Sequence, residues 1–343
     1  MTHPRVLVLY NSPTLPPDHP DVAAEAEVVE TVEFVVESLR AEGFDVGRLG
    51  ISDNPRPLLD TLETSRPHVV FNLFEGTASR GATEAYVTAL LEWLRVPYTG
   101  CPHQAIALAR DKPKTKLLLQ GVGLPTPRFQ VVENLPCPTC ELRWPVMVKL
   151  AAEDASIGIS QLSVVESQRA LAERVSLLFE QYHQPILLEE FIDGREINVA
   201  ILEAPELRLL PISEIIFAQA PGIRWPIVTY DAKWATGSAA DRATTPRCPA
   251  ELSAPLAQRL QDLAVRAYRL LGCRDYARID FRVNHVNESF VLEVNPNPDY
   301  HPGAGLARSL RAANLDHARV TADLVRNALA RGNSTTNATA LAR

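Results

Sequence analysis

Apolar residues recur along the chain with two different spacings, and the two alternate. Residues 6–10 form a short apolar run typical of a strand, and residues 46–49 and 69–74 form two more. Between the first two runs lies a stripe of apolar residues three to four apart, which predicts a helix, and a second helix is expected over residues 82–94. The order strand, helix, strand, strand, helix predicts a small open sheet that ends near Gly100.

Two further units with the same mixture of elements follow. In the second, Asp111 can cap a helix over residues 112–120, because aspartate accepts hydrogen bonds from the first N–H groups of a helix. Its other expected elements are strands at 128–132 and 146–150 and a helix at 170–182. The third unit is predicted to contain strands at 186–191, 196–202 and 209–217, a polar loop at 229–245, a long helix at 254–271, two last strands and a closing helix from about 316 to 330.

This order predicts the α/β fold class and more than one domain, because 343 residues exceed what one compact core usually holds. We expect an N-terminal open α/β domain over residues 1–100. Two α+β subdomains, residues 101–185 and 186–331, should follow, with a flexible tail over residues 332–343.

Composition narrows the function. The net charge is −7, so the chain lacks the basic surface of a nucleic-acid-binding protein. No apolar run is long enough for a membrane span, and the first apolar run is too short for a signal peptide. Five cysteines, an odd and sparse set, suggest a reducing compartment, and we expect the cytoplasm. Cys137 and Cys140 lack a second ligand pair nearby, which favours two loop cysteines over a zinc site.

Two strand-like segments near the C-terminus carry the main candidate chemistry. Residues 277–283 alternate apolar and charged side chains, as a half-buried strand requires, and Arg278 and Asp280 share the polar face. In the second segment Glu293 and Asn295 share one face. The apolar residues expected on its other face are Phe290, Leu292 and Val294.

The short polar connection between these segments predicts a hairpin. A turn centred on Val286 and Asn287 pairs Asp280 with Glu293, and Arg278 with Asn295, at about 5 Å. Two adjacent carboxylates repel each other and so require a cation, and oxygen ligands beside phosphates suit Mg²⁺. The alternative is a surface hairpin with solvated charges, which the abrupt turn into a proline-containing loop disfavours.

Several motifs in the same order resemble the ATP-grasp superfamily, specifically its D-alanine–D-alanine ligase-like branch. The resemblance runs from about residue 5 to residue 330. Its motifs are residues 96–100 (VPYTG), 111–112 (DK), 145–149 (PVMVK), 156–158 (SIG), 188–196 (LEEFIDGRE), 231–233 (DAK), 278–280 (RID) and 293–296 (EVNP).

The resemblance implies how ATP would be held. Lys112 and Lys149 would bind phosphates, Met147 would form a floor for adenine, and Ser156 would lie in a loop that closes over the phosphates through its backbone N–H groups. Lys233 would reach the γ-phosphate from a mobile loop.

The resemblance also assigns the base and the ribose. Glu189 would accept a hydrogen bond from the adenine amino group, the backbone of Glu190 and Ile192 would complete base recognition, and Glu196 would hold the ribose hydroxyls. Without the resemblance, this acidic cluster would be interpreted as a solvated strand edge.

The implied reaction is an ADP-forming ligation of a small-molecule carboxylate and amine through an acyl phosphate. Asp280, Glu293 and Asn295 would hold Mg²⁺, with Mn²⁺ as a second candidate, and Arg278 would stabilise the acyl phosphate and the oxyanion. Arg278, Lys233 and Ser156 are therefore the expected catalytic residues, and a homodimer is expected because the family is often dimeric.

The departures from the family concern the substrate. Enzymes that make D-alanyl-D-alanine usually carry a hydroxyl residue at Ala155, a tyrosine at Trp234, a glycine at Asp299 and a serine near Ala304. The loop of residues 75–80 replaces a histidine-containing loop, and the glutamate that binds the first amino group has no clear equivalent. The candidates for that glutamate are Glu25, Glu27 and Glu30.

We therefore expect substrates other than two D-alanines, with one amino acid among them. The candidate specificity residues are Glu75, Arg80, Trp234, Asp299 and His301. One alternative is a true D-alanine–D-alanine ligase, and another is a nucleotide-binding sensor or scaffold, which the complete metal patch disfavours. A dinucleotide-dependent oxidoreductase is disfavoured because no GxGxxG follows the first strand.

Overall fold

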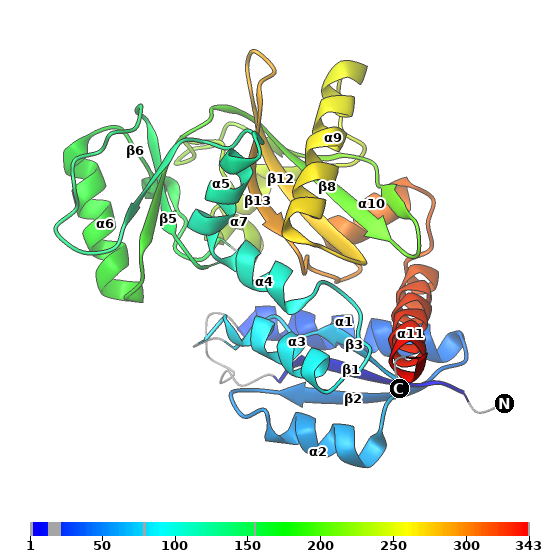
Figure 1. The fold of residues 1–343 in the computed structure, drawn as a ribbon. Coiled ribbons are helices and arrows are strands. Elements are labelled where there is room, and N and C mark those ends of the chain that lie inside the picture. Colours follow the sequence, from blue (N-terminus) through cyan, green and yellow to red (C-terminus); the bar gives the residue numbers. More distant parts are fainter. Residues whose placement is uncertain (1–2, 13–21, 78–79, 154–155, 342–343) are drawn as a thin grey trace.

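The computed structural model describes residues 3–12, 22–77, 80–153 and 156–341, without the side chains of residues 22–26 and 333–341. Within this part the helices and strands follow one another in three sheets with helices against them (Figure 1). This architecture confirms the expected α/β class.

The first sheet is parallel, with strand order β2-β1-β3. Alternate residues of β1 (Arg5–Asn11) point to opposite faces of the sheet. Its valines pack with α1 (Val22–Ala41) and α11 (His317–Leu341), whereas its leucines pack with α2 (Arg56–Ser65) and α3 (Thr83–Trp93). The other two strands are β2 (Asp45–Ile51) and β3 (Val69–Leu73).

Helix α2 lies where the pattern predicted a direct connection between two strands. Because β2 and β3 both run parallel to β1, their connection must cross over, and α2 provides the crossover. Only Leu58 and Leu62 of α2 are buried, too few to produce a visible stripe. Helix α4 (His103–Arg110) was also missed, since two of its three buried residues are alanines.

The second sheet has the order β4-β7-β5-β6 and is antiparallel. Helix α5 (Lys112–Gly121) precedes it, and the Asp111 side chain accepts from the N–H of Lys114, which confirms the predicted cap. Helix α6 (Gln168–Tyr182) packs against one face of the sheet. The strands are β4 (Phe129–Val132), β5 (Val146–Leu150), β6 (Val164–Val165) and β7 (Ile186–Glu190).

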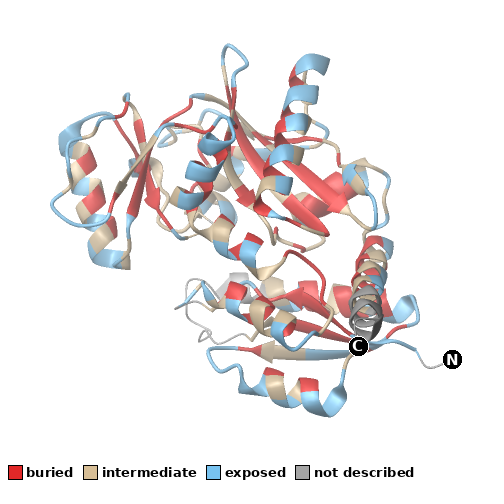
Figure 2. Cartoon of the chain, in the orientation of Figure 1, coloured by how far each residue is buried: buried red, intermediate tan, exposed pale blue. Residues whose placement is uncertain are grey.

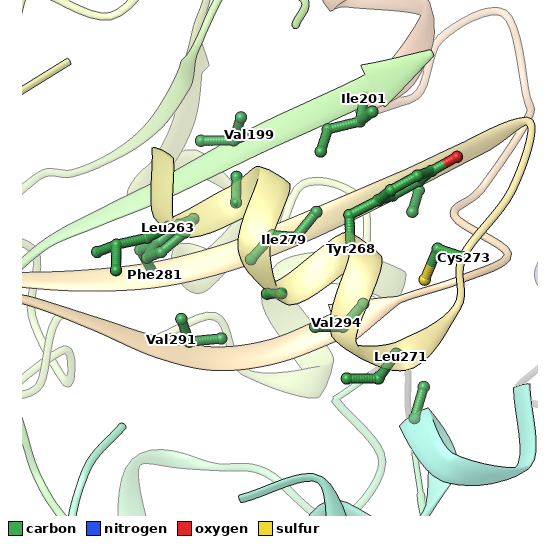
Figure 3. Packing of buried hydrophobic residues seen from close by; sticks show 14 of the residues in the cluster. Val199, Ile201, Leu263, Tyr268, Leu271, Cys273, Ile279, Phe281, Val291 and Val294 are labelled. Atoms are coloured by element: carbon green, nitrogen blue, oxygen red, sulfur yellow. The ribbon is translucent and has the colours of Figure 1, made fainter. Parts of the chain in front are cut away.

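The third sheet is antiparallel, with order β11-β10-β8-β12-β13, and β9 pairs with β8. Helix α9 (Ala254–Leu271) packs its apolar face on this sheet, and Figure 3 shows Leu263, Tyr268 and Leu271 against the strand valines and isoleucines. Buried residues run along these strands, whereas the outer face of α9 is exposed (Figure 2). The strands are β8 (Gly194–Glu203), β9 (Leu207–Leu209), β10 (Ser213–Phe217), β11 (Thr244–Arg247), β12 (Tyr276–Asn284) and β13 (Ser289–Asn295).

Three predicted boundaries change in this unit. The single strand expected over residues 209–217 is two strands, because Pro211 between them has no N–H for a ladder. The expected loop 229–245 contains α7 (Tyr230–Trp234), α8 (Ala239–Arg242) and the start of β11. After the short α10 (Gly305–Ala312), helix α11 continues to Leu341 rather than to about residue 330.

Helix α11 returns to the first sheet and does not stay with the third. Leu324 and Val325 of this helix share a core with Val32 of α1 and Phe71 of β3. The domain limits stay a prediction. The core of the first unit also includes α11, which comes from the end of the described chain.

Asp275 joins three distant segments at the base of β12. Its carboxylate is fully buried, with side-chain exposure of 0%, and receives a bidentate contact from Arg331 of α11 at 2.6 and 2.9 Å. It also accepts from the N–H of Gly100 at 2.8 Å and from the Asn327 amide at 3.0 Å. Asp275 therefore ties the end of the first unit and the closing helix to the third sheet.

Candidate active site

The hairpin of β12 and β13 forms the predicted residue pairs. Asp280 lies opposite Glu293, and Arg278 lies opposite Asn295. Asp280 is only 7% exposed, so the patch is not a solvated surface hairpin.

A β-bulge brings these pairs about, and the prediction did not include it. Asp280 pairs with Glu293, but the next residue, Phe281, pairs with Val291, so Leu292 is extra. Leu292 lines the same pocket as Glu293 instead of facing away from it. The predicted strict alternation of this strand is therefore wrong, although the predicted pairs are right.

Asp280 is the centre of a dense hydrogen-bond network. The Arg278 guanidinium donates to both of its oxygens at 2.8 Å. The amides of Asn198 and Asn295 donate at 2.7 and 2.9 Å. This arrangement fixes the guanidinium beside the carboxylates.

Glu293 lies between cations. Its carboxylate is 3.7 Å from the Lys112 ammonium. Burial alone would raise its pKa, but Lys112, Lys149 and Arg278 outweigh burial and lower the pKa of Glu293 to about 2. Glu293 is therefore ionised at neutral pH.

The residues at this position suit a divalent cation. Burial, opposed by Arg282 and assisted by the neighbouring Asp280 and Glu293, raises the pKa of Glu196 to about 7. Such a concentration of negative charge, with carboxylate and amide oxygens, matches the ligands that Mg²⁺ takes in proteins. The Asn295 amide nitrogen faces Asp280, so this amide would have to rotate to offer its oxygen.

A pocket between the second and third sheets collects most of the predicted nucleotide residues. Its apolar side includes Met147, Ile159, Phe191 and Ile227, which pack together around a small buried cluster. Its polar lining contains eight of the predicted residues: Lys112, Lys149, Ser156, Glu189, Glu190, Glu196, Asp280 and Glu293. The pocket thus has one apolar wall and one charged wall.

Lys116, which sequence reasoning missed, is buried behind this pocket. It is 1% exposed, donates to Thr126 Oγ1 at 2.7 Å and pairs with Glu189, whose other oxygen pairs with Lys149. Burial lowers the pKa of Lys116 to about 8, although Glu189 opposes the shift. A sequence signal existed, since Lys116 lies four residues after Lys112, on the same face of the helix.

The predicted contacts to the base differ in how accessible their atoms are. Both Glu189 oxygens already receive an ammonium, so its expected role as an acceptor for adenine stays a prediction. The N–H of Glu190 donates to the Arg128 carbonyl at 2.9 Å. The N–H of Ile192 has no hydrogen bond within the described part of the chain, and it borders the pocket.

Ser156 and Lys233 have different placements. Ser156 lines the pocket and adopts a left-handed backbone with φ 61°, next to Ala155, which lies outside the described residues. Lys233 is on α7 with its ammonium 4.8 Å from the centre of the Trp234 ring, and it is not among the residues that line the pocket. The structure therefore does not bring Lys233 to the expected phosphate position.

The specificity residues of the first unit lie on an exposed loop. The N–H of Glu75 donates to Asn11 Oδ1 at 2.8 Å, and the Arg80 guanidinium is 3.9 Å from the Asp53 carboxylate. Residues 78 and 79 of this loop lie outside the described part.

The specificity residues after β13 meet helix α1. The His301 ring lies 3.5 Å from the Glu27 carboxylate and 3.3 Å from that of Glu30, and the backbone N–H of His301 donates to Asp299 Oδ1 at 2.9 Å. Burial and the nearby Asp299 raise the pKa of Glu27, against the effect of His301 and Lys233. Glu27 and Glu30 thus lie beside His301, and their role in binding a substrate stays a prediction; the side chain of Glu25 lies outside the described residues.

Other kinds of site find no support in the described residues. Among the described residues, no group of three or more His, Cys, Asp and Glu side chains could hold a metal ion. The predicted magnesium ligands do not form such a group, because they are two carboxylates and one amide. Cys137 and Cys140 are both free thiols. None of the described helices has the length and apolarity needed to cross a membrane.

Comparison with known proteins relates this chain to a family of ligases. The family model described as "D-ala D-ala ligase C-terminus" matches residues 118–326. The D-alanine–D-alanine ligase of Desulforudis audaxviator is 32% identical over 89% of this chain and 95% of its own length. An uncharacterized protein of Sinorhizobium fredii, y4sG, is 36% identical over 72% of this chain and 73% of its own length.

A solved structure shows the same fold. The D-alanine–D-alanine ligase of Bacillus anthracis, crystallised with ATP, superposes with a TM-score of 0.74 over 96% of this chain and 99% of that chain, at 19% identity.

Proposed function

Because the chain belongs to the D-alanine–D-alanine ligase family of ATP-grasp enzymes, which form carbon–nitrogen bonds and release ADP, we propose that it ligates a carboxylate and an amine other than two D-alanines. One substrate is an amino acid in this proposal. The pocket between the second and third sheets is proposed as the ATP site.

The apolar wall with Met147 and Phe191 would receive adenine, and the N–H of Ile192 would donate to the base. Lys112 and Lys149 would bind phosphates, and Lys116 would neutralise Glu189 so that Lys149 is not fully paired by it. The ribose would lie at Glu196.

The reaction needs charge neutralisation and positioning rather than a protein nucleophile. Asp280, Glu293 and Asn295 would hold Mg²⁺, which when bound would neutralise the charge of the transferred phosphoryl group. Arg278, held by Asp280, would donate to the acyl phosphate formed by the substrate carboxylate, and then to the oxyanion formed when the amine attacks.

The cluster of Asp299, Glu27 and Glu30 around His301 carries the proposal on specificity. These residues place an excess of carboxylates on the substrate side, and Asp299 is near enough to Arg278 to contribute to the raised pKa of its guanidinium. Such a surface suits a substrate with a cationic nitrogen and gives the methyl groups of two D-alanines little to bind. A homodimer remains a prediction.

A screen of amino-acid pairs tests this function. We expect phosphate release from ATP and Mg²⁺ that depends on both a carboxylate and an amine, at least about tenfold faster with an amino acid that carries an extra cationic group than with D-alanine alone. Release that is fastest with D-alanine alone would instead support a D-alanine–D-alanine ligase. ATP binding without release for any pair would support a nucleotide-binding sensor.

Arg278→Ala tests the proposed oxyanion role. We expect kcat to fall about a hundredfold, because one preorganised donor to developing charge is lost, while the affinity for ATP changes little. Rapid-quench kinetics of phosphate release and calorimetric titration of an ATP analogue separate the two quantities. A loss of nucleotide affinity with unchanged kcat would contradict the role.

A further inference from the structure

Arg110, the last residue of α4, connects the first unit to the segment that leads into the nucleotide pocket. Its guanidinium donates to the Ala152 carbonyl at 3.0 Å and lies 4.0 Å from the Glu153 carboxylate. On its other side the Glu84 carboxylate of α3 is 3.6 Å away. Arg110 therefore bridges two units, and its side chain is largely buried, with 14% exposed.

Lys112 holds the same segment from the pocket side. Its backbone N–H donates to the Ala151 carbonyl at 3.2 Å, and its ammonium donates to the Glu153 carbonyl at 2.6 Å. Glu153, Lys112 and Ser156 all line the pocket. Residues 151–153 thus fix both the backbone and the ammonium of Lys112.

Glu84 connects the other end of this network to the hairpin. It is 6% exposed, and its carboxylate accepts from the Asn297 amide at 3.2 Å. Asn297 lies two residues after Asn295, and it also donates to the Phe74 carbonyl at 3.3 Å, at the start of the exposed substrate loop.

Gly81 leaves the space that Arg110 occupies. A Cβ atom at this position would lie 1.8 Å from one guanidinium nitrogen of Arg110 and 2.5 Å from its central carbon. The α3 side of the contact is therefore shaped around the guanidinium.

We propose that Arg110 is a positioning residue, which fixes residues 151–153 against the first unit and thereby holds Lys112 in place for the triphosphate. This inference rests on the proposed ATP site. It assigns to a residue outside the pocket an effect on phosphate binding, and it leaves the base and ribose contacts unchanged.

Two independent substitutions test the inference. Arg110→Met removes the guanidinium, and Gly81→Ala leaves it intact but displaces it, which a flexible side-chain end can accommodate without unfolding. We expect each to weaken the binding of Mg²⁺ with adenylyl imidodiphosphate about tenfold, because hydrogen bonds to a charged group are lost. Titration calorimetry measures this affinity.

Adenosine, titrated at high concentration, distinguishes loss of phosphate binding from a general loosening of the pocket. A loosened pocket would bind both adenosine and the triphosphate analogue more weakly. We expect both variants to bind adenosine like the original protein, and the double variant to bind the triphosphate analogue no more weakly than Arg110→Met alone. Arg169→Met, an exposed arginine of α6 that pairs with Glu173, is the matched control and should change nothing.

Three results would overturn the inference: unchanged binding of the analogue in either variant, equal losses for adenosine and the analogue, or additive losses in the double variant. If the unsubstituted protein does not bind the analogue at all, the proposed ATP site fails, and that outcome is distinct from these three.

Discussion

Replacing Glu293 by alanine is expected to reduce phosphate release from ATP at least about a thousandfold, because the proposed Mg²⁺ site would lose a carboxylate ligand and several kcal/mol of charge neutralisation. The Glu293 carboxylate also lies 3.7 Å from the Lys112 ammonium, so its removal also deprives Lys112 of an ionic partner. The measurement is kcat at saturating ATP and Mg²⁺ with the substrate pair found by the screen.

Glu288→Ala is the control for this experiment. Glu288 lies in the turn of the same hairpin and is exposed, and its carboxylate accepts from the Asn284 side-chain amide at 2.7 Å. It should keep full activity, and both variants should keep the same thermal unfolding midpoint within a few degrees. An unchanged rate in Glu293→Ala would refute the metal assignment.

Replacing Asp275 by alanine is expected to lower the free energy of unfolding by about 3–5 kcal/mol, because it leaves the buried contacts of Arg331 without their counter-charge. The substitution also removes acceptors from Gly100 and Asn327, and alanine tolerates the left-handed backbone at this position, φ 63°, less well than aspartate. Urea denaturation followed by circular dichroism and tryptophan fluorescence measures the loss.

Asp323→Ala on α11, the helix that carries Arg331, is the comparison. Asp323 forms an exposed pair with Arg326 at 2.8 Å, and removing it should cost at most about 0.5 kcal/mol. A loss below about 1 kcal/mol in Asp275→Ala would show that the junction contributes little to stability.

Sequence patterns predicted the regular parts of this fold well, and the reasons for the failures are physical. Helix α9 was predicted with its observed limits because a continuous apolar stripe covers one face of it. Helices α2 and α4 were missed because they bury few large side chains. The strand expected over residues 209–217 is divided into two because Pro211 has no N–H to pair with a neighbouring strand.

In the site, too, features set by local spacing were predicted, whereas features set by tertiary contacts were not. The pairs of the hairpin follow from spacing, but the bulge at Leu292 depends on how β13 packs beneath α9, which no local pattern encodes. Lys116 could have been found from its helical spacing to Lys112, whereas its contact with Glu189 joins residues 73 positions apart. The position of Lys233 away from the pocket depends on the short helix α7, which was predicted as loop.

The return of α11 to the first sheet has a consequence for synthesis of the chain on the ribosome. The strands β1, β2 and β3 are made well before α11, the helix that covers part of one of their faces. Val8 and Phe71 in the nascent first unit therefore lack this cover while more than 240 further residues, from Leu73 to His317, are translated. Exposed apolar surface of this kind favours binding by chaperones, so the core of the first unit can be completed only after α11 has been synthesised.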